Sequence, residues 1–467
     1  MKKKLLLAMA VLGAAAWQGA NAIVLKANDN EFANVGLELQ IWAQNDGKVT
    51  SNDHTSNNFS VNNARVYFSG EINPIVQFGA DLDFADHDYS GLPADGTARA
   101  HQGTSYTRVS DAFINFKFMP EFQLMAGLFR DPVSRLSNTD EYTYVIPTGF
   151  GYGFDEVWGN ITGDASGVLK RKLAVAGPHG STHYIPEYLN GTNYALDNLL
   201  NPFTPITLGD DVQNANRDAG IAIWGNVADT MLKYYLFAAN GAYDYQAGLN
   251  SEGNLKYGIR VEFTPTMLGY KNSSGFVDQD TFLGALNNLT IGLGYEQQKL
   301  DCSNTSSPVI KELCGGQTSS ITPKYYDVDA NWEQKFGTFV PQIQLGWAEK
   351  KDLMVGYNNS NVKSTGYYVQ LAALYDQVVG IGKPGIAFRW ENSKVDNANF
   401  LTLDGQSAKI NRYGIFVNYY IAGEAAKMSL GADIVDPNGA LKSVSLPNDN
   451  GNLKSFTDWT LALQTEF

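Results

Sequence analysis

The chain has 467 residues, a formal net charge of −14, 18% charged residues and 12% aromatic residues. The excess of acidic over basic residues argues against nucleic-acid binding, because that function needs clustered lysine and arginine. The abundant aromatics exclude a disordered chain, and 46 glycines beside 25 tyrosines are not typical of a helical core.

The N-terminus predicts a secretory signal peptide at residues 1–22. Three lysines at Lys2–Lys4 precede a short apolar run, and Ala20-Asn21-Ala22 follows as a cleavage signal. The run is too short for a transmembrane helix, which needs about 20 apolar residues. Residues 23–467 are then expected to form one domain, whose formal net charge becomes −17 once the three lysines are removed from −14.

Alternation with a period of two recurs from residue 34 to the C-terminus and predicts an all-β fold. One parity is apolar, as in Val35, Leu37, Leu39 and Ile41, and the interleaved positions are polar or charged. Segments of about 10 residues that alternate in this way are typical of a transmembrane antiparallel β-barrel. The sixteen segments are residues 34–44, 60–69, 75–85, 108–118, 121–129, 218–227, 230–240, 254–264, 288–299, 323–334, 338–349, 365–376, 385–394, 410–421, 426–436 and 456–467.

A soluble β-sandwich would also alternate, but two features disfavour it. The apolar parity of these segments carries no charged side chain, as expected of a face that meets lipid. Aromatics lie on this parity towards the segment ends, for example Tyr326, Trp347 and Trp459, where a barrel has its interfacial girdles. The charged parity cannot form a dry core, since unpaired buried charge is too costly. We therefore expect it to face water inside the barrel.

The connections and the C-terminus fit a closed barrel. Short turns alternate with long polar loops along the chain. Residues 265–287 are the exception, because they are long where a short turn is expected. The chain ends inside an alternating pattern, with Trp459, Leu461, Leu463 and Phe467 on one parity. Because no sheet edge can stay open in lipid, the last strand should pair with the first, near Val35–Ile41. Both termini are expected on the periplasmic side.

Cys302 and Cys314 lie close together in a polar stretch and predict a disulfide that staples an external loop. An exported protein favours such a bond, and closing a loop of this length contributes about 3 kcal/mol. A metal site is the alternative, but it would need further ligands and no histidine is near.

Two resemblances narrow the protein class. The final strand, with Trp459, Leu461, Leu463 and Phe467, resembles the C-terminal signal that bacterial outer-membrane proteins present to their assembly machinery. Residues 62–84, 122–144 and 216–244 resemble the phosphate-selective porin (O and P type) family. This resemblance implies a homotrimeric channel of about 16 strands in outer-membrane lipid, whose long third loop, here residues 130–217, folds inward as a constriction. The acidic excess on the lumen-facing parity departs from the family, so phosphate selectivity does not carry over.

Charged residues at the constriction would set the selectivity of such a channel. The pore-lining candidates are Arg65, Lys117, Lys256, Arg260, Arg389 and Arg412 on the wall, and Arg130, Asp131, Arg135, Asp140 and Glu141 on the loop. Each could instead be a solvated lumen charge or part of a structural pair.

We expect a porin for passive diffusion of small hydrophilic solutes and ions, with a weak preference for cations. An anion- or phosphate-selective channel is one alternative, and an outer-membrane barrel enzyme or adhesin is another. All five histidines fall in predicted loops, so the wall offers no base for a Ser–His site. We predict no catalytic residue, metal site or cofactor.

Overall fold

The computed structural model covers most of the chain. It describes residues 23–28, 31–49, 55–85, 108–163, 175–176, 182–183, 200–206, 216–241, 254–303, 319–353, 355–356, 360–397, 407–443, 445–446 and 451–467. The predicted signal peptide, residues 1–22, lies outside the described residues.

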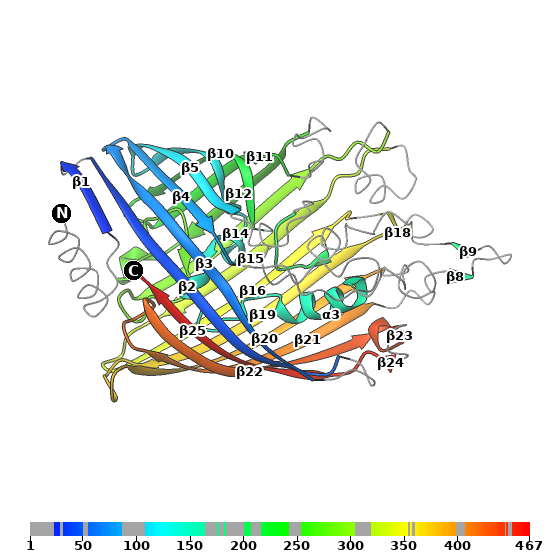
Figure 1. The fold of residues 1–467 in the computed structure, drawn as a ribbon. Helices are drawn as coiled ribbons and strands as arrows, with labels where there is room; N and C mark the ends of the chain where they lie inside the picture. Colours follow the sequence, from blue (N-terminus) through cyan, green and yellow to red (C-terminus); the bar gives the residue numbers. More distant parts are fainter. Residues whose placement is uncertain are drawn as a thin grey trace, which may run out of the picture.

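Sixteen antiparallel strands form one closed barrel (Figure 1). Each overlaps one of the sixteen predicted segments, which confirms the predicted fold class. The strands are β2 (Glu31–Asp46), β3 (Ser56–Asn73), β4 (Val76–Asp83), β5 (Arg108–Met119), β6 (Phe122–Arg130), β10 (Arg217–Val227), β11 (Leu232–Ala239), β12 (Lys256–Phe263), β14 (Asn288–Gln298), β15 (Lys324–Glu333), β16 (Phe339–Lys351), β19 (Lys363–Tyr375), β20 (Lys383–Asp396), β21 (Ala408–Tyr420), β22 (Ala426–Gly439) and β25 (Phe456–Glu466). A further strand, β1 (Ile23–Asn28), pairs with the first residues of β2.

The barrel closes where the last strand meets the first. β25 pairs antiparallel with β2, in a register that runs from Glu38 opposite Glu466 to Asn45 opposite Trp459. The Phe467 N–H donates to the Leu37 carbonyl at 3.0 Å, and the Leu37 N–H donates back to the Phe467 carbonyl at 2.8 Å. The pairing predicted for the C-terminal strand is therefore confirmed, and it continues the ladder to the last residue.

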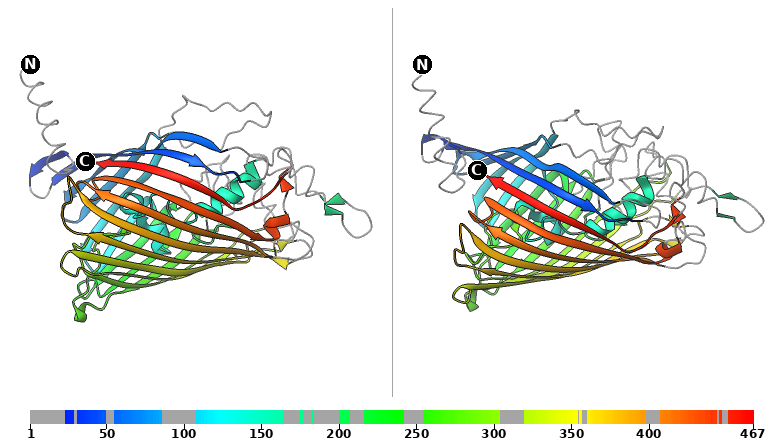
Figure 2. Two further views of the ribbon diagram at one scale, coloured as in Figure 1. Left: turned by 90° about the horizontal axis from the view of Figure 1, so that it is seen from below. Right: turned by 60° about the horizontal axis from the view of Figure 1, so that its bottom comes forward.

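Short helices and strands make up the remaining secondary structure. Different elements lie at the two ends of the barrel. β1 and the C-terminus lie at one end, which we call the terminus end, while β8, β9, β23 and β24 lie at the other, the loop end (Figures 1 and 2). Among the described residues, no helix is long and apolar enough to cross a membrane. The short elements are α2 (Arg135–Asn138), β7 (Thr139–Asp140), η1 (Glu141–Thr143), α3 (Tyr152–Gly163), β8 (Val175–Ala176), β9 (Thr182–His183), η4 (Thr266–Leu268), β13 (Asp278–Gln279), β17 (Val355–Gly356), β18 (Ser360–Asn361), η6 (Ala440–Ser443), β23 (Ser445–Leu446) and β24 (Gly451–Asn452).

The two faces of the wall have opposite character. On β12, Ile259 points outward and is 40% exposed, whereas its neighbour Arg260 points inward and is 0% exposed. The same alternation places Ile415 and Leu463 on the outer face. An apolar outer face would be unfavourable in water and matches the lipid-facing band of a transmembrane barrel. The apolar parity found in the sequence is therefore the outer surface.

An apolar core fills part of the barrel towards the loop end. Phe154, Val157 and Trp158 of α3 are buried against inward-facing wall residues that include Ile410 and Val435. Figure 1 shows α3 among the strands at this end. The core ties α3 to β21 and β22, so this side of the barrel is occupied by protein.

A charged residue at mid-depth on the outer face should destabilise the protein. We expect Ile415→Arg to lower the free energy of unfolding in phospholipid vesicles by ~2–4 kcal/mol, because guanidinium loses hydration in the bilayer core. Ile421→Arg, at the terminus-end rim, should cost only ~0–1 kcal/mol. Denaturant titrations of both variants check this, and equal losses would contradict the placement of Ile415 at the bilayer midplane.

Candidate functional site

The third long connection, Asp131–Asn216, which we call loop L3, folds into the barrel. Its residues 131–139 and 142–148 are buried, so the predicted inward-folding third loop is confirmed for its described part. The turn into the lumen is fixed locally by Ser134, whose hydroxyl accepts from the Ser137 N–H at 3.1 Å and caps α2. Such a cap satisfies the first amides of a helix that is too short to satisfy them itself.

The connection that is too long for a turn, residues 265–287, also folds into the barrel, from the terminus end. We call it the insert. Its strand β13 pairs in parallel with β7 of L3. The Asp280 carboxylate accepts from the Val145 N–H at 2.9 Å and from the Gln370 amide at 3.0 Å, which joins the insert to L3 and to β19. L3 and the insert therefore form one internal unit.

An aromatic cluster anchors the insert to the wall. The Phe276 ring meets Phe129, Trp224 and Tyr235 edge-on, at centroid distances of 5.8, 5.4 and 5.2 Å. The Phe276 carbonyl accepts from the Tyr235 hydroxyl at 2.8 Å and from the Asn138 amide of L3 at 2.7 Å. The same residue thus packs on the wall and bonds to L3.

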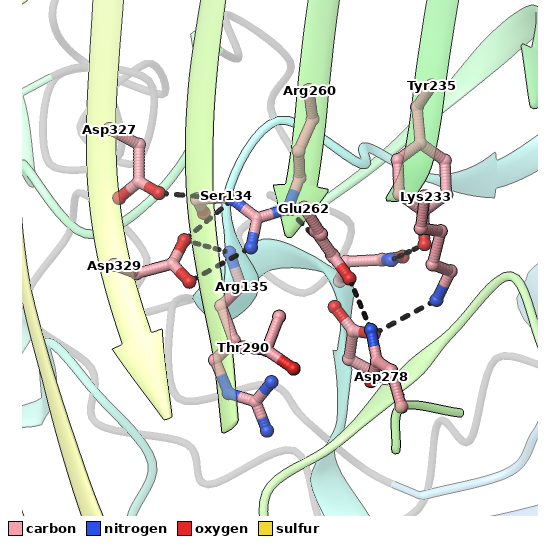
Figure 3. Close-up of polar contacts among 12 residues, drawn as sticks. Ser134, Arg135, Lys233, Tyr235, Arg260, Glu262, Asp278, Thr290, Asp327 and Asp329 are labelled. Carbon is pink, nitrogen blue, oxygen red and sulfur yellow. Dashed lines mark hydrogen bonds and ion pairs between the residues drawn. The ribbon is translucent and has the colours of Figure 1, made fainter. Parts of the chain in front are cut away.

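Arg260 is the centre of a buried ion-pair network on β12 and β15 (Figure 3). Its guanidinium bonds to Asp329 at 2.6 Å, Glu262 at 2.9 Å and Asp327 at 3.3 Å. The Arg135 N–H of L3 donates to the same Asp329 carboxylate at 3.4 Å. The pairing satisfies charges that have no access to water, and it holds the start of α2 against the wall.

A second network surrounds Arg412 and fixes the middle of L3. Arg412 pairs with Asp433 at 2.8 Å and Glu391 at 2.9 Å, and donates to the Thr148 hydroxyl of L3 at 2.6 Å. The neighbouring Arg389 stacks on the ring of Phe150 at 3.6 Å from its centroid. Both arginines thus act on L3 rather than on an open lumen.

A third network has the L3 carboxylate of Glu141 at its centre. Arg65, Arg130 and Arg217 approach it at 2.8, 3.5 and 3.4 Å. Burial by itself would raise the pKa of Glu141, but the three arginines lower that pKa well below its usual value. Two wall carboxylates complete the network, because Arg65 also bonds to Asp83 and Arg217 to Asp111.

The predicted constriction residues fall into two groups. Six are at most 1% exposed and lie between L3 and the wall, namely Asp131, Arg135, Lys256, Arg260, Arg389 and Arg412. The side chains of Asp140 and Glu141 are 38% and 25% exposed, and those of Arg65 and Arg130 only 4% and 5%. Lys117, on β5, is partly exposed. Most of the predicted basic residues therefore lie in structural ion pairs. This is one of the two alternatives to pore lining, the other being a solvated lumen charge.

Sequence reasoning did not single out several carboxylates that hold these bases. Asp327, Asp329 and Asp433 lie on the inward parity of their strands, so the alternation in the sequence could have identified them as inward-facing. Asp278 of the insert, which pairs with Lys233 at 3.2 Å, had no such signal because the insert has no periodicity. Figure 3 shows Lys233 and Asp278 beside Glu262.

Of the cysteines and histidines, Cys302 and His183 lie in the described part of the chain. Cys302, which follows β14, is disulfide-bonded, and its predicted partner Cys314 lies outside the described residues. His54, His87, His101 and His179 also lie outside them. Within the described part of the chain, no group of three or more His, Cys, Asp or Glu side chains could hold a metal ion.

Comparisons with known proteins support the fold. No family model and no curated protein sequence matches the chain. The structure of Pseudomonas putida OprB at high pH aligns with a TM-score of 0.52 and 10% identity, over 93% of this chain and 94% of that one. Salmonella typhi OmpF, in complex with daunomycin, aligns with a TM-score of 0.50 and 12% identity, over 95% and 100%. At these identities the likeness concerns the fold alone, and the resemblance to phosphate-selective porins stays a prediction.

Breaking the Arg412 network should destabilise the protein strongly. Arg412→Gln leaves Asp433 and Glu391 buried with fewer partners, and we expect a loss of ~3–5 kcal/mol in the free energy of unfolding. The control is Lys394→Gln, which removes a partly exposed pair with Asp396 and should cost ~0–1 kcal/mol. Denaturant titration measures both. A loss at Arg412 no larger than at Lys394 would show that the network does not hold L3.

The low pKa of Glu141 predicts a specific pH dependence. A carboxylate with a depressed pKa stabilises the fold above its unfolded pKa of about 4.3, and this contribution is lost as the pH falls through the lower folded pKa. The difference in unfolding free energy between wild type and Glu141→Gln should therefore be constant from neutral pH to about pH 5 and shrink in more acidic solution. A difference that disappears already near neutral pH would contradict the three-arginine arrangement.

Proposed function

We propose that the protein is an outer-membrane channel for passive diffusion of small hydrophilic solutes and ions. The observation that carries this proposal is a closed barrel with an apolar outer face, a charged inner face and a loop folded into its interior. An apolar outer band is compatible with a lipid bilayer. Channels of this architecture limit the size of solutes by narrowing a polar lumen with protein.

The interior supports a narrow path rather than a wide pore. Wall side chains such as Lys233, Arg260 and Gln370 have no access to water, since L3 and the insert cover them. In a wide water-filled lumen these side chains would be hydrated. We therefore expect a low single-channel conductance for a barrel of this strand number.

The setting of the channel is inferred from the sequence. Residues 1–22 would direct export and be removed, and Trp459, Leu461, Leu463 and Phe467 would present the final strand to the assembly machinery. Both termini would lie in the periplasm and the Cys302–Cys314 disulfide in an external loop. We include a homotrimer in the proposal on the ground of the resemblance to the phosphate-selective porin family.

Phosphate selectivity receives little support from the charges on the wall. Lys256, Arg260, Arg389 and Arg412 are buried, and each lies in an ion pair with at least one carboxylate. A base that is already paired and away from water cannot attract a permeating anion as a free base would. The anion-selective alternative would need bases from elsewhere.

The test is electrical. Purified, refolded protein in a planar lipid bilayer should give steady, low-conductance steps, and detergent without protein should give none. The reversal potential across a potassium chloride gradient then reports which ion passes. No conductance from protein that is folded by circular dichroism would contradict the channel and favour an adhesin or a barrel enzyme.

A further inference from the structure

The two sides of the barrel interior differ in their access to water. Inward side chains on β11 to β22, such as Lys233, Asp329 and Ser429, are buried beneath L3 or the insert. Some inward side chains on β2, β3, β4 and β25 are partly exposed, although others on these strands, such as Arg65 and Gln464, are buried. We call five of the partly exposed side chains the open wall, namely Glu38, Tyr67, Ser69, Asp81 and Glu466.

L3 presents its exposed margin to the open wall. The Asp140 side chain is the more exposed of the two acids at this turn, and the adjacent Glu141 reaches Arg65 of β3 at 2.8 Å. The charges of Asp140, Asp81 and Glu466 all act on Glu38, as does that of Arg65. The space between L3 and the open wall is therefore bordered by carboxylates on both sides.

The bases nearest to this space are turned away from water. Arg65, Arg130 and Arg217 are 4%, 5% and 4% exposed, and their guanidinium groups bond to Glu141, Asp83 and Asp111. Lys117 of β5 is a partly exposed base on this side. An ion that passes through this part of the lumen would therefore meet mainly negative side chains.

We propose that the permeation path is eccentric, runs between the open wall and the Asp140 turn of L3, and admits small cations and small cationic solutes in preference to anions. This inference rests on the proposed channel function. It follows from where the described residues fill the barrel, since among them the inward side chains that reach water lie on the uncovered side. Fixed charges in a narrow path with low-dielectric walls concentrate counter-ions, so the exposed carboxylates set the selectivity.

The first experiment measures selectivity. The wild type should reverse towards the potassium potential in a potassium chloride gradient. The combined variant Glu38→Gln, Asp81→Asn, Asp140→Asn should reverse closer to zero than the wild type, because three of the fixed charges that attract potassium are gone. The control Asp376→Asn removes a carboxylate that lies in a turn at the terminus end and pairs with Lys335 and Lys383, and it should keep the wild-type reversal potential.

The second experiment locates the path with a matched pair of serine replacements. Ser69→Cys places a thiol on the open wall, and Ser429→Cys places one on the covered side of the lumen, where Ser429 is 1% exposed. Cys302 is disulfide-bonded and does not compete for the reagent. A small cationic methanethiosulfonate should reduce the current through Ser69→Cys and leave that through Ser429→Cys unchanged.

The outcomes distinguish the proposal of an eccentric cation path from the proposal of a channel function. A channel that conducts but reverses towards chloride, or keeps its selectivity in the combined variant, overturns the cation path and leaves the channel function standing. Equal block of both cysteine variants also overturns it. Absence of conductance in folded wild-type protein overturns both proposals.

Discussion

The pairing of β25 with β2 is the constraint on which the rest of the structure depends. In a bilayer every backbone amide and carbonyl must find a partner within the protein, and a sheet can meet this demand only by closing on itself. The reciprocal hydrogen bonds between Leu37 and Phe467 complete that closure at the very end of the chain. Once the barrel is closed, the alternation of side chains directs half of each strand inward, where every charge needs water or a partner.

In the barrel interior, basic side chains of the wall donate hydrogen bonds to backbone carbonyls of the irregular loop L3 as well as to carboxylates. A loop inside a barrel has carbonyls that no strand can pair. The Tyr142 and Tyr144 carbonyls accept from Lys427, and the Thr139 carbonyl accepts from Arg130. The same bases are held by acids such as Glu424 and Glu141. Wall and loop thus satisfy each other, which explains how an irregular segment can lie at membrane depth.

The sequence predicted the strands well because a period of two is a strong local signal over about ten residues. It also indicated the closing strand, since Trp459 to Phe467 alternates to the end. It did not show that residues 265–287 fold inward, because an aperiodic segment such as that around Phe276 and Asp278 gives no clue to its partners. Nor could parity distinguish Arg260 from Asp81. Both point inward, and only the path of L3 through the lumen decides which one is covered.

That distinction matters more for function than the net charge of the chain. Charges beneath L3 and the insert, such as Arg260 with Asp329, neutralise one another and contribute to stability rather than to the field in the water-filled part of the lumen. Charges on the uncovered side, such as Asp81 and Asp140, remain able to act on a passing ion. The internal unit therefore does two things at once. It narrows the barrel, and by covering one side it determines which of the lumen's acids and bases a solute can meet.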